Sequence, residues 1–560
     1  MDRDLIDRKT ECDVLIVGGG VAGCMAAVEA SETDTALRVI VMEKAAIRRS
    51  GAAARGMDAL NVVMIPGQAS AAEYLESIDM MSQGVFDEKV SRRLVDESFS
   101  SLKRLEGWGV EFPKNEAGEY LVSQFHPRGR FMVEMRGGDF KPILAQQVKK
   151  HGIHILERTV ATKLFVKEGE IRGAAGFNVR TGKLIIVEAK AVILTCGGAG
   201  RIGLPQTGYL HGTFNYPYNS GDGYSLALRA GVELTNFEAT WTSSTTKDYN
   251  GPGLSTFIRH NGHMVNALGE RFLSRYAPDH MERAPAGIRY KATWKEIQEG
   301  RGPIYFDLTH LTPETLSLIE EGIFTVERPT TKQFLESRGI DPRKDWIEVI
   351  LSETYMEGGH GMTGVIINDE AETNIRGLYA AGDIAANPFG FLTAALVFGR
   401  IAGRNAADYA KKANKPTIEE EEAEAERRCI NALFDERRTL DPSQFEYKTR
   451  RIVNEYLQPP KTERKLLTAL GYVERLKKDA NQLRAEDPHQ AMKALEAISI
   501  LDCVEMATLA SLERKESRWG LMHLRVDYPK RDDQNWLKYV VVKMGEDREI
   551  KTETRPIGGA

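Results

Sequence analysis

The chain has 560 residues, 42% hydrophobic and 28% charged, a composition that supplies several buried cores and a length that fits about three or four domains. Its formal net charge of −5 excludes a strongly electrostatic partner such as nucleic acid or an anionic membrane surface. The five cysteines are scattered and form no C-x-x-C pair, so we expect reduced thiols, no metal site and a cytoplasmic protein. Residues 1–10 lack the apolar segment of a secretory signal, and no apolar run is long enough to predict a membrane-spanning helix.

Residues 12–44 follow the order strand, glycine-rich turn, helix and second strand. Residues 14–17 and 37–42 are short apolar runs typical of buried strands. Small residues at positions 21–30 predict a helix between them. This order is that of a nucleotide-binding βαβ unit.

Three glycines occupy the turn of this unit. Gly18, Gly20 and Gly23 have the spacing G-x-G-x-x-G, which permits a tight turn, a close approach to a pyrophosphate and close packing of helix on strand. The helix N-terminus adds free N–H groups and a positive dipole end. Glu43, which ends the second strand, can accept hydrogen bonds from a ribose and would repel a 2′-phosphate. The alternative is a glycine-rich turn without a ligand, but the complete unit predicts dinucleotide binding.

Residues 45–61 are rich in small side chains, with Arg48, Arg49 and Arg55 among them. Small residues suit a backbone that passes close to a flat cofactor. The alternative is a flexible surface loop. Because the segment follows the ribose-binding acid directly, we interpret it as part of the cofactor site.

The next part of the chain alternates helical and strand patterns. Residues 71–108 have helical periodicity, and residues 159–166 and 170–178 alternate like strands. Residues 184–187 and 191–195 are predicted as two further strands, which complete a small meander.

Two glycine turns return the chain to the predicted cofactor site. The strand that ends at residue 195 runs into a glycine pair, and residues 219–234 form a glycine turn that opens a helix with Asp222 in its first turn. Residues 364–385 read as strand, turn and strand, followed by Gly382-Asp383. An aspartate at such a loop is suited to hold the ribityl chain of a flavin.

The remaining segments differ in composition. Residues 240–349 are polar and mixed, which indicates an inserted cap domain. Residues 411–511 are charged with helical periodicity, and their acidic run at 419–426 is interpreted as a solvated helix face. Residues 538–543 and 549–553 are predicted to form a hairpin.

The ordered motifs resemble those of the fumarate reductase/succinate dehydrogenase flavoprotein family over nearly the whole chain, and most of all its adenylylsulfate reductase alpha-subunit branch. They include VGGGVAG, RSGAAARGMDALN, NSGDGYSLALRAG, EGRGPIYFDL, NIRGLYAAGD and ESRWGLMHLRVDYPKRDDQNWLK. The resemblance implies FAD and catalysis at a domain interface. Covalent members carry a histidine where this chain has Gly51, so the FAD is expected to be noncovalent.

The expected fold is therefore α/β, a Rossmann-like FAD-binding domain with an inserted α+β capping domain, followed by a C-terminal helical domain. The predicted boundaries are 1–240 and 350–410 for the FAD-binding domain, 241–349 for the cap, 411–515 for the helical domain and 516–560 for a tail with the hairpin.

Candidate site residues come from the motifs and from the resemblance. His360, which follows two glycines and matches the active-site histidine of the family, is the first catalytic candidate; the alternative is a structural loop histidine. Arg289 and Lys291 lie where the family carries its cap arginine, and either is a proton donor, an anion anchor or part of an ordinary basic helix. The predicted cofactor-binding residues are Gly18, Gly20, Gly23, Glu43, Lys44, Ser50, Gly51, Gly56, Gly197, Asp222, Gly382, Asp383, Phe391 and Leu392.

Two departures from the family bear on the substrate. Ala386 stands where succinate and fumarate enzymes carry a carboxylate-binding arginine, which argues against fumarate. Thr245 or Thr246 stands where the adenylylsulfate reductase branch carries an arginine, which argues against adenylylsulfate. An aromatic or neutral substrate is then an open alternative. The residues name no substrate, direction of reaction or oligomeric state.

Electron supply completes the functional prediction. The sequence contains one complete dinucleotide motif and no cluster ligands, so the resemblance implies a ferredoxin-like iron–sulfur partner subunit. We expect an FAD-dependent reductase or dehydrogenase that exchanges electrons with this partner. The alternatives are an oxidase reoxidised by O₂ and a noncatalytic electron-transfer flavoprotein.

Overall fold

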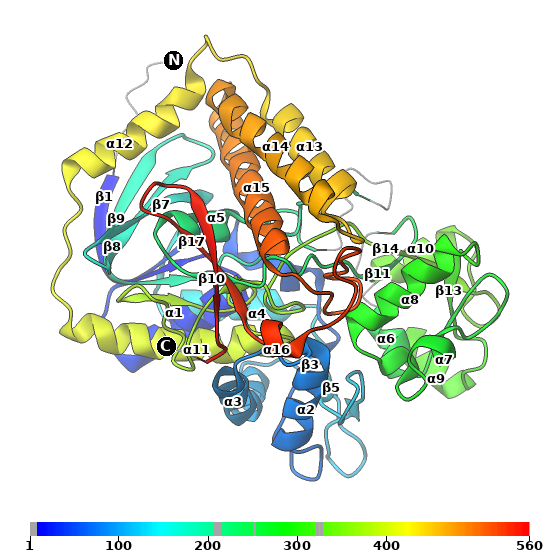
Figure 1. Cartoon of the computed structure of the whole chain (residues 1–560). Coiled ribbons are helices and arrows are strands. Elements are labelled where there is room, and N and C mark those ends of the chain that lie inside the picture. Colours follow the sequence, from blue (N-terminus) through cyan, green and yellow to red (C-terminus); the bar gives the residue numbers. More distant parts are fainter. Residues whose placement is uncertain (1–7, 206–214, 250–253, 321–323, 325–328, 559–560) are drawn as a thin grey trace.

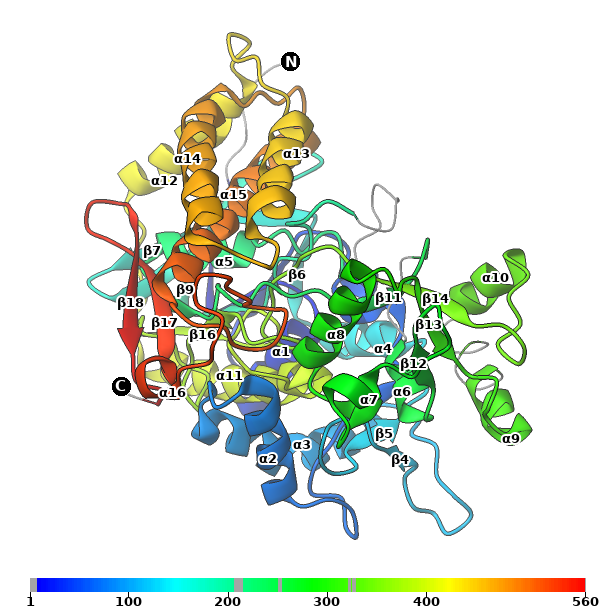
Figure 2. The same cartoon turned by 45° about the vertical axis from the view of Figure 1, so that its right-hand side comes forward.

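The structure is a computed structural model that describes residues 8–205, 215–249, 254–320, 324 and 329–558. Figures 1 and 2 show the arrangement from two directions, with the cap elements on one side of the sheet region and a group of long helices above it. The expectation of no secretory signal rests on residues 1–10, and the first seven of these lie outside the residues that the structure describes.

A seven-stranded sheet forms the centre of the largest region. Its first strand, β1 (Arg8–Val17), pairs in parallel with β2 (Val39–Glu43) on one side and with β9 (Leu184–Leu194) on the other. The residues of β2 and the last four of β1 are buried, which explains their continuous apolar runs. The strand order is β6 (His154–Glu157), β2, β1, β9, β8 (Glu170–Asn178) and β7 (Thr159–Lys167), with β16 (Leu378–Ala380) also paired to β9.

Two small-residue helices lie against each other beside this sheet. Helix α1 (Val21–Thr33) follows β1, and α11 (Phe391–Lys412) packs on it. A Cβ atom at Gly399 would lie 2.6 Å from the carbonyl oxygen of Ala22, and one at Gly403 would lie 2.4 Å from that of Ala26. The glycines of α11 therefore set the distance between these helices, and the N-terminal residues of α1 lie beside the middle of α11.

The sequence prediction of two strands at 184–187 and 191–195 is wrong, because β9 is one continuous strand. Its first part pairs with β8, and its last part pairs with β16. The polar residues in its middle, Glu188 and Lys190, have partners. Glu188 is 2.9 Å from Lys9 Nζ and accepts a hydrogen bond of 2.9 Å from the Ile418 amide.

The predicted helical segment 71–108 consists of two helices. Helix α2 (Ala71–Ser82) ends where Gln83 and Gly84 adopt left-handed conformations, with φ of 50° and 85°. Helix α3 (Glu88–Gly107) begins at the side chain of Asp87, which accepts hydrogen bonds from two amides of its first turn.

The inserted cap has a hydrophobic core of its own. Its antiparallel sheet has the order β11 (Ser244–Thr246), β14 (Ile347–Leu351), β13 (Ile304–Asp307) and β12 (His263–Val265). Helices surround this sheet, as Figure 2 shows in green. The buried residues of the second hydrophobic cluster all fall between Leu254 and Val349. The cap helices are α6 (Leu254–Arg259), α7 (Leu273–Tyr276), α8 (Ala286–Gln298), α9 (Pro313–Ser317) and α10 (Pro329–Ser337).

The C-terminal region contains α13 (Pro442–Ile452), α14 (Glu463–Asp479) and the long α15 (Pro488–Glu513), which pack together. The predicted hairpin is confirmed as β17 (Tyr539–Met544) and β18 (Ile550–Arg555). The predicted fold class is confirmed: an α/β region with an inserted cap is followed by helices. Among the described residues, no helix is both long and apolar enough to cross a membrane.

Candidate functional site

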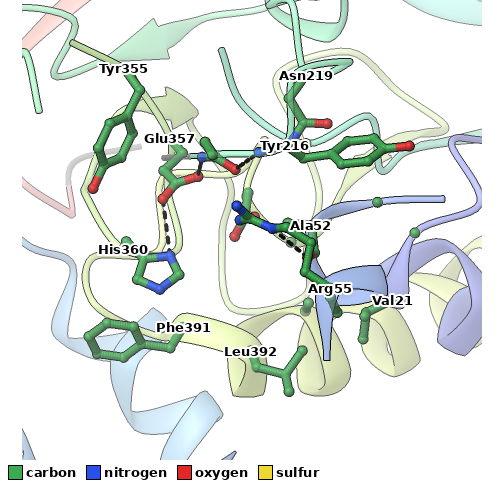
Figure 3. Close-up of a pocket in the computed structure, with 18 of the residues that line it drawn as sticks. Val21, Ala52, Arg55, Tyr216, Asn219, Tyr355, Glu357, His360, Phe391 and Leu392 are labelled. Carbon is green, nitrogen blue, oxygen red and sulfur yellow. Dashed lines mark hydrogen bonds and ion pairs between the residues drawn. The ribbon is translucent and has the colours of Figure 1, made fainter. Parts of the chain in front are cut away.

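A cavity of about 470 Å³ lies between the sheet region, the cap and α15. Figure 3 shows part of its wall. The cavity brings together most of the predicted site residues. Those that line it are Gly18, Gly20, Glu43, Lys44, Gly51, Gly56, Gly197, Asp222, Arg289, His360, Gly382, Asp383, Phe391 and Leu392.

The three glycines of the turn have different surroundings. A Cβ atom at Gly23 would lie 1.9 Å from the Gly18 carbonyl oxygen and 2.8 Å from Thr195 Oγ1, so Gly23 serves the packing of α1 and does not line the cavity. Gly18 has a φ of 106° and makes the turn. At Gly20, no atom of the described residues lies within 4 Å of the Cβ position, which faces the open cavity at the N-terminus of α1. This surface is free for a phosphate group to approach the backbone.

Glu43 lies beside this turn and is buried. One carboxylate oxygen accepts a 2.6 Å hydrogen bond from the Gly19 amide, and the other accepts a 2.7 Å bond from the Ala45 amide. These two bonds fix the carboxylate and leave acceptor capacity, since an ionised carboxylate has about four acceptor sites. The open face at Gly20 and the fixed acid at Glu43 therefore fit the pyrophosphate and a ribose of a dinucleotide.

Lys44 and Asp222 belong to a buried ion network that also reaches the C-terminal helices. Lys44 Nζ is 2.8 Å from Asp222 and 3.0 Å from Glu496 of α15, and Arg201 Nη2 is 2.7 Å from the other oxygen of Glu496. Burial alone would raise the pKa of Glu496, but Lys44 and Arg201 outweigh it and lower the pKa to about 2. Both predicted residues line the cavity, yet their charges are already paired within the protein.

The segment after Glu43 passes along the cavity as predicted. Gly51 and Gly56 have φ of 83° and 86°, values that favour glycine, and both line the cavity. Ser50 is buried, and its hydroxyl donates a 3.5 Å hydrogen bond to the Gly19 carbonyl. Ser50 does not line the cavity, so it joins this segment to the glycine turn.

Gly382 and Asp383 enter the cavity from the end of β16. Gly382 has a φ of 80°, and a Cβ atom at Gly359 would lie 2.0 Å from the Asp383 carboxylate. Burial, together with the charge of Glu357, raises the pKa of Asp383 to about 7. The protein therefore holds this acid in close contact with the loop that carries His360.

His360 points into the cavity and is held from behind by Glu357 (Figure 3). Its Nδ1 is 3.0 Å from Glu357 Oε1, and the side chains are 50% and 1% exposed, respectively. The Asn215 side chain binds the second oxygen of Glu357. Burial alone would lower the pKa of His360, but the hydrogen bond and charge of Glu357, with the charge of Asp383, raise it. Glu357 was not predicted from the sequence; the signal that could have found it is a carboxylate three residues before the histidine.

The cap places only one of its two predicted catalytic residues at the cavity. Arg289, on α8, is 4% exposed and lines the cavity. Lys291, two residues later, is exposed and does not line it, so the structure does not support Lys291 as a site residue. The reason is the helical geometry, because positions two apart lie on different faces of a helix.

The positions that depart from the family lie away from the cavity wall. Neither Ala386 nor Thr245 lines it in the described structure, and both are buried. The cap side of the wall is largely apolar and contains serine hydroxyls. Its residues include Trp241, Ser243, Leu254, Ile258, Met264 and Phe306.

Comparison with known proteins agrees with this geometry. The chain matches a sequence model described as the FAD binding domain over residues 13–394, and one described as the fumarate reductase flavoprotein C-terminal region over residues 447–558. It is 29% identical to one of the subunits of the CoM/CoB fumarate reductase of Methanothermobacter marburgensis, over 93% of this chain and 95% of that protein. It is 25% identical to the adenylylsulfate reductase alpha subunit of Megalodesulfovibrio gigas, over 94% of this chain and 92% of that one.

A solved structure shows the same arrangement. Adenylylsulfate reductase from Archaeoglobus fulgidus superposes with a TM-score of 0.91 at 27% identity, covering 99% of this chain and 97% of that one. The fold, the cavity and these matches define an FAD-dependent oxidoreductase. More particularly, the chain belongs to the fumarate reductase/succinate dehydrogenase flavoprotein family.

Proposed function

We propose that this chain is the catalytic flavoprotein subunit of a reductase or dehydrogenase, in which His360 exchanges a proton with the substrate. The observation that carries the proposal is the pair formed by His360 and Glu357 at the cavity wall, with Nδ1 and Oε1 3.0 Å apart. Because Glu357 engages Nδ1, the other ring nitrogen, Nε2, is left for the cavity. A raised pKa keeps the imidazolium available as a proton donor near neutral pH.

FAD supplies hydride or single-electron transfer when bound. We propose that Gly20 and the α1 N-terminus hold its pyrophosphate, Glu43 a ribose and Asp383 the ribityl chain, with Gly51 and Gly56 passing close to the ring. Gly51 carries no nucleophilic side chain, so the cofactor is held noncovalently. The remaining cofactor-site predictions that line the cavity, Gly197, Phe391 and Leu392, belong to the same proposal.

We further propose that an iron–sulfur subunit resembling a ferredoxin exchanges electrons with this chain. The named relatives are subunits of larger enzymes, which supports a partner. The five unpaired cysteines support a reducing compartment, and we propose the cytoplasm. The separate hydrophobic cluster between Leu254 and Val349 supports the proposed cap boundaries of 241–349.

The test is an anaerobic acceptor screen. The purified FAD-loaded chain is photoreduced, and candidate acceptors are added while the flavin absorbance is followed. Rapid reoxidation by an organic acceptor, with slow reoxidation by air, supports the reductase. Rapid oxygen consumption with stoichiometric peroxide on substrate turnover would instead establish the oxidase. Reoxidation by neither class would refute the proposal and leave a noncatalytic electron-transfer flavoprotein.

A further inference from the structure

We infer that Phe391 is a positioning residue for His360. A strained turn at residues 389–391 holds the phenylalanine ring against the imidazole and so fixes the direction in which Nε2 faces the cavity. The inference rests on the proposed function and adds a second role to the place of Phe391 in the proposed cofactor site. It is carried by the contact between the two rings, whose centres are 5.1 Å apart at an interplanar angle of 85°.

The turn from Phe389 to Phe391 has an unusual backbone. The φ angles of these two residues are 56° and 49°, in the left-handed region that a bulky side chain rarely adopts. Phe391 is also the first residue of α11, where a φ of about −63° is usual for a helix. Left-handed residues of this kind persist only where their surroundings enforce them, and they gather at functional sites.

Two backbone hydrogen bonds join this turn to the loop that carries the histidine. The Phe391 amide donates a 3.1 Å bond to the Gly359 carbonyl, and the Phe389 amide donates a 3.1 Å bond to the Gly361 carbonyl. The two acceptors belong to the residues on either side of His360. The strained turn therefore clasps the histidine loop at both of its flanking positions.

Close packing prevents both segments from relaxing. A Cβ atom at Gly390, in the middle of the turn, would lie 2.6 Å from a side chain of α11. In the histidine loop, a Cβ atom at Gly359 would lie 2.0 Å from the Asp383 carboxylate, and one at Gly361 would lie 2.5 Å from Trp241 Nε1. The backbone on both sides of the imidazole is thus fixed.

The imidazole itself needs a second contact to be fixed. Glu357 holds it at one point, with Nδ1 and Oε1 3.0 Å apart, and a single hydrogen bond leaves the ring free to pivot. The contact with Phe391 limits this rotation, and its edge-to-face geometry lies in the range that aromatic pairs prefer. Figure 3 shows Glu357 and Phe391 on different sides of His360. Together they set the direction of Nε2.

The Phe391 ring is supported by an aromatic cluster. It lies 6.3 Å from the Phe125 ring and 5.4 Å from the His126 ring. His126 Nε2 is 3.1 Å from the side-chain oxygen of Asn61, and the Thr393 hydroxyl of α11 donates a hydrogen bond to the Asn61 carbonyl. The cluster and the first turn of α11 are therefore held by the same residue, which keeps the Phe391 ring in place.

The first experiment observes the ring contact directly by NMR, without turnover. The chain has 11 histidines, so ¹³C-labelled histidine gives a small set of ring signals, and His360→Asn identifies the signal of His360. The ring current of Phe391 displaces this signal. We expect the displacement to be lost in Phe391→Leu and kept in Phe391→Tyr, both in the FAD-loaded chain and in the apoprotein. The control Phe99→Leu removes a similar edge contact, to Tyr120 at 6.3 Å, outside the cavity and should leave the signal unchanged.

The second experiment measures the consequence for proton transfer. Photoreduced flavin is reoxidised anaerobically by fumarate or trans-cinnamate, whose double bonds take up two electrons and two protons, and by ferricyanide, which takes up electrons alone. In Phe391→Leu the limiting rate with the organic acceptor should fall at least about tenfold, because the proton donor is misdirected. The half-saturating acceptor concentration and the ferricyanide rate should not change, and Phe391→Tyr should restore the native rate.

The same His360 signal in the native protein and in Phe391→Leu would overturn the inference, as would an equal change in Phe99→Leu. Loss of FAD from Phe391→Leu with an unchanged His360 signal would also overturn it, since the ring would then serve the cofactor alone. If Phe391→Leu does not fold, Phe391→Met removes the ring and provides the same comparisons.

The proposed function and this inference can fail separately. Loss of the His360 displacement in Phe391→Leu, with no reoxidation of the native flavin by any organic acceptor of the screen, would refute the proposed function alone. Reoxidation of the native flavin by fumarate or trans-cinnamate, at a limiting rate that Phe391→Leu does not lower, would refute this inference alone.

Discussion

Replacing Gly20 or Gly23 by alanine separates cofactor binding from folding within one motif. At Gly20 the added methyl group would enter open space in the cavity, and a φ of −66° is allowed for alanine. At Gly23 the same methyl group would lie 1.9 Å from a backbone oxygen that cannot yield. The first change occupies the proposed phosphate surface, whereas the second forces α1 away from the sheet.

The magnitudes follow from these contacts. Gly23→Ala should lower the free energy of unfolding by about 3 kcal/mol, the upper end of the usual overpacking cost, because its nearest neighbour is the backbone carbonyl of Gly18. Gly20→Ala should change the unfolding free energy of the apoprotein by less than about 0.5 kcal/mol. It should weaken FAD binding by about 1–3 kcal/mol, or roughly 5- to 150-fold, because the methyl group displaces the phosphate.

The assay uses apoprotein prepared by removal of the flavin. Urea unfolding gives the stability of each variant, and quenching of FAD fluorescence gives its dissociation constant. Unchanged FAD affinity in Gly20→Ala would refute the assignment of the phosphate site. Native stability of Gly23→Ala would refute the packing argument.

Two other substitutions test the charged groups. Glu357→Gln removes the hydrogen bond and charge that raise the pKa of His360. In the native protein this pair stabilises the fold below pH 6.5, and the stabilisation is lost as the pH rises through the folded-state pKa of His360. The variant should lack this pH-dependent stabilisation. The pH midpoint of His360 carbethoxylation by diethyl pyrocarbonate, followed by peptide mass spectrometry, should be lower in the variant than in the native protein. The same midpoint in both proteins would contradict the role of Glu357 in raising the pKa of His360. Glu496→Gln should destabilise the protein at pH 7 by about 3–5 kcal/mol, because it leaves Lys44 short of a buried partner. The pKa of Glu496 is lowered from 4.5 to about 2, so this difference, measured by urea unfolding, should shrink as pH falls through that range; a difference that persists at pH 2 would exclude the ion network as its cause.

Local patterns in the sequence were sufficient for the nucleotide-binding unit. The strand, glycine turn and helix around Gly18 are set by contacts between near neighbours, and the structure has them where the pattern predicts. The continuous strand β9 was not predictable in the same way. Its polar middle is satisfied by Ile418, 230 residues away, which no local window contains.

The candidate site shows the same division. His360 and Gly382 were found from motifs, since each depends on the backbone of its own loop. The partner of Lys44 on α15 is 452 residues away in sequence, so no local pattern could predict this pair. Arg289 and Lys291 were both candidates from the sequence, and only the structure shows that Arg289 lines the cavity and Lys291 does not.

The central claim is that His360 transfers a proton to the substrate in a cavity that holds FAD. The direct measurement is the anaerobic single-turnover rate at which the photoreduced flavin is reoxidised by the best acceptor of the screen, in the native protein and in His360→Asn. We predict a rate at least about 100-fold lower in the variant, the usual contribution of general acid catalysis, with the same FAD content and the same photoreduction. Equal rates in the two proteins would contradict the assignment of His360.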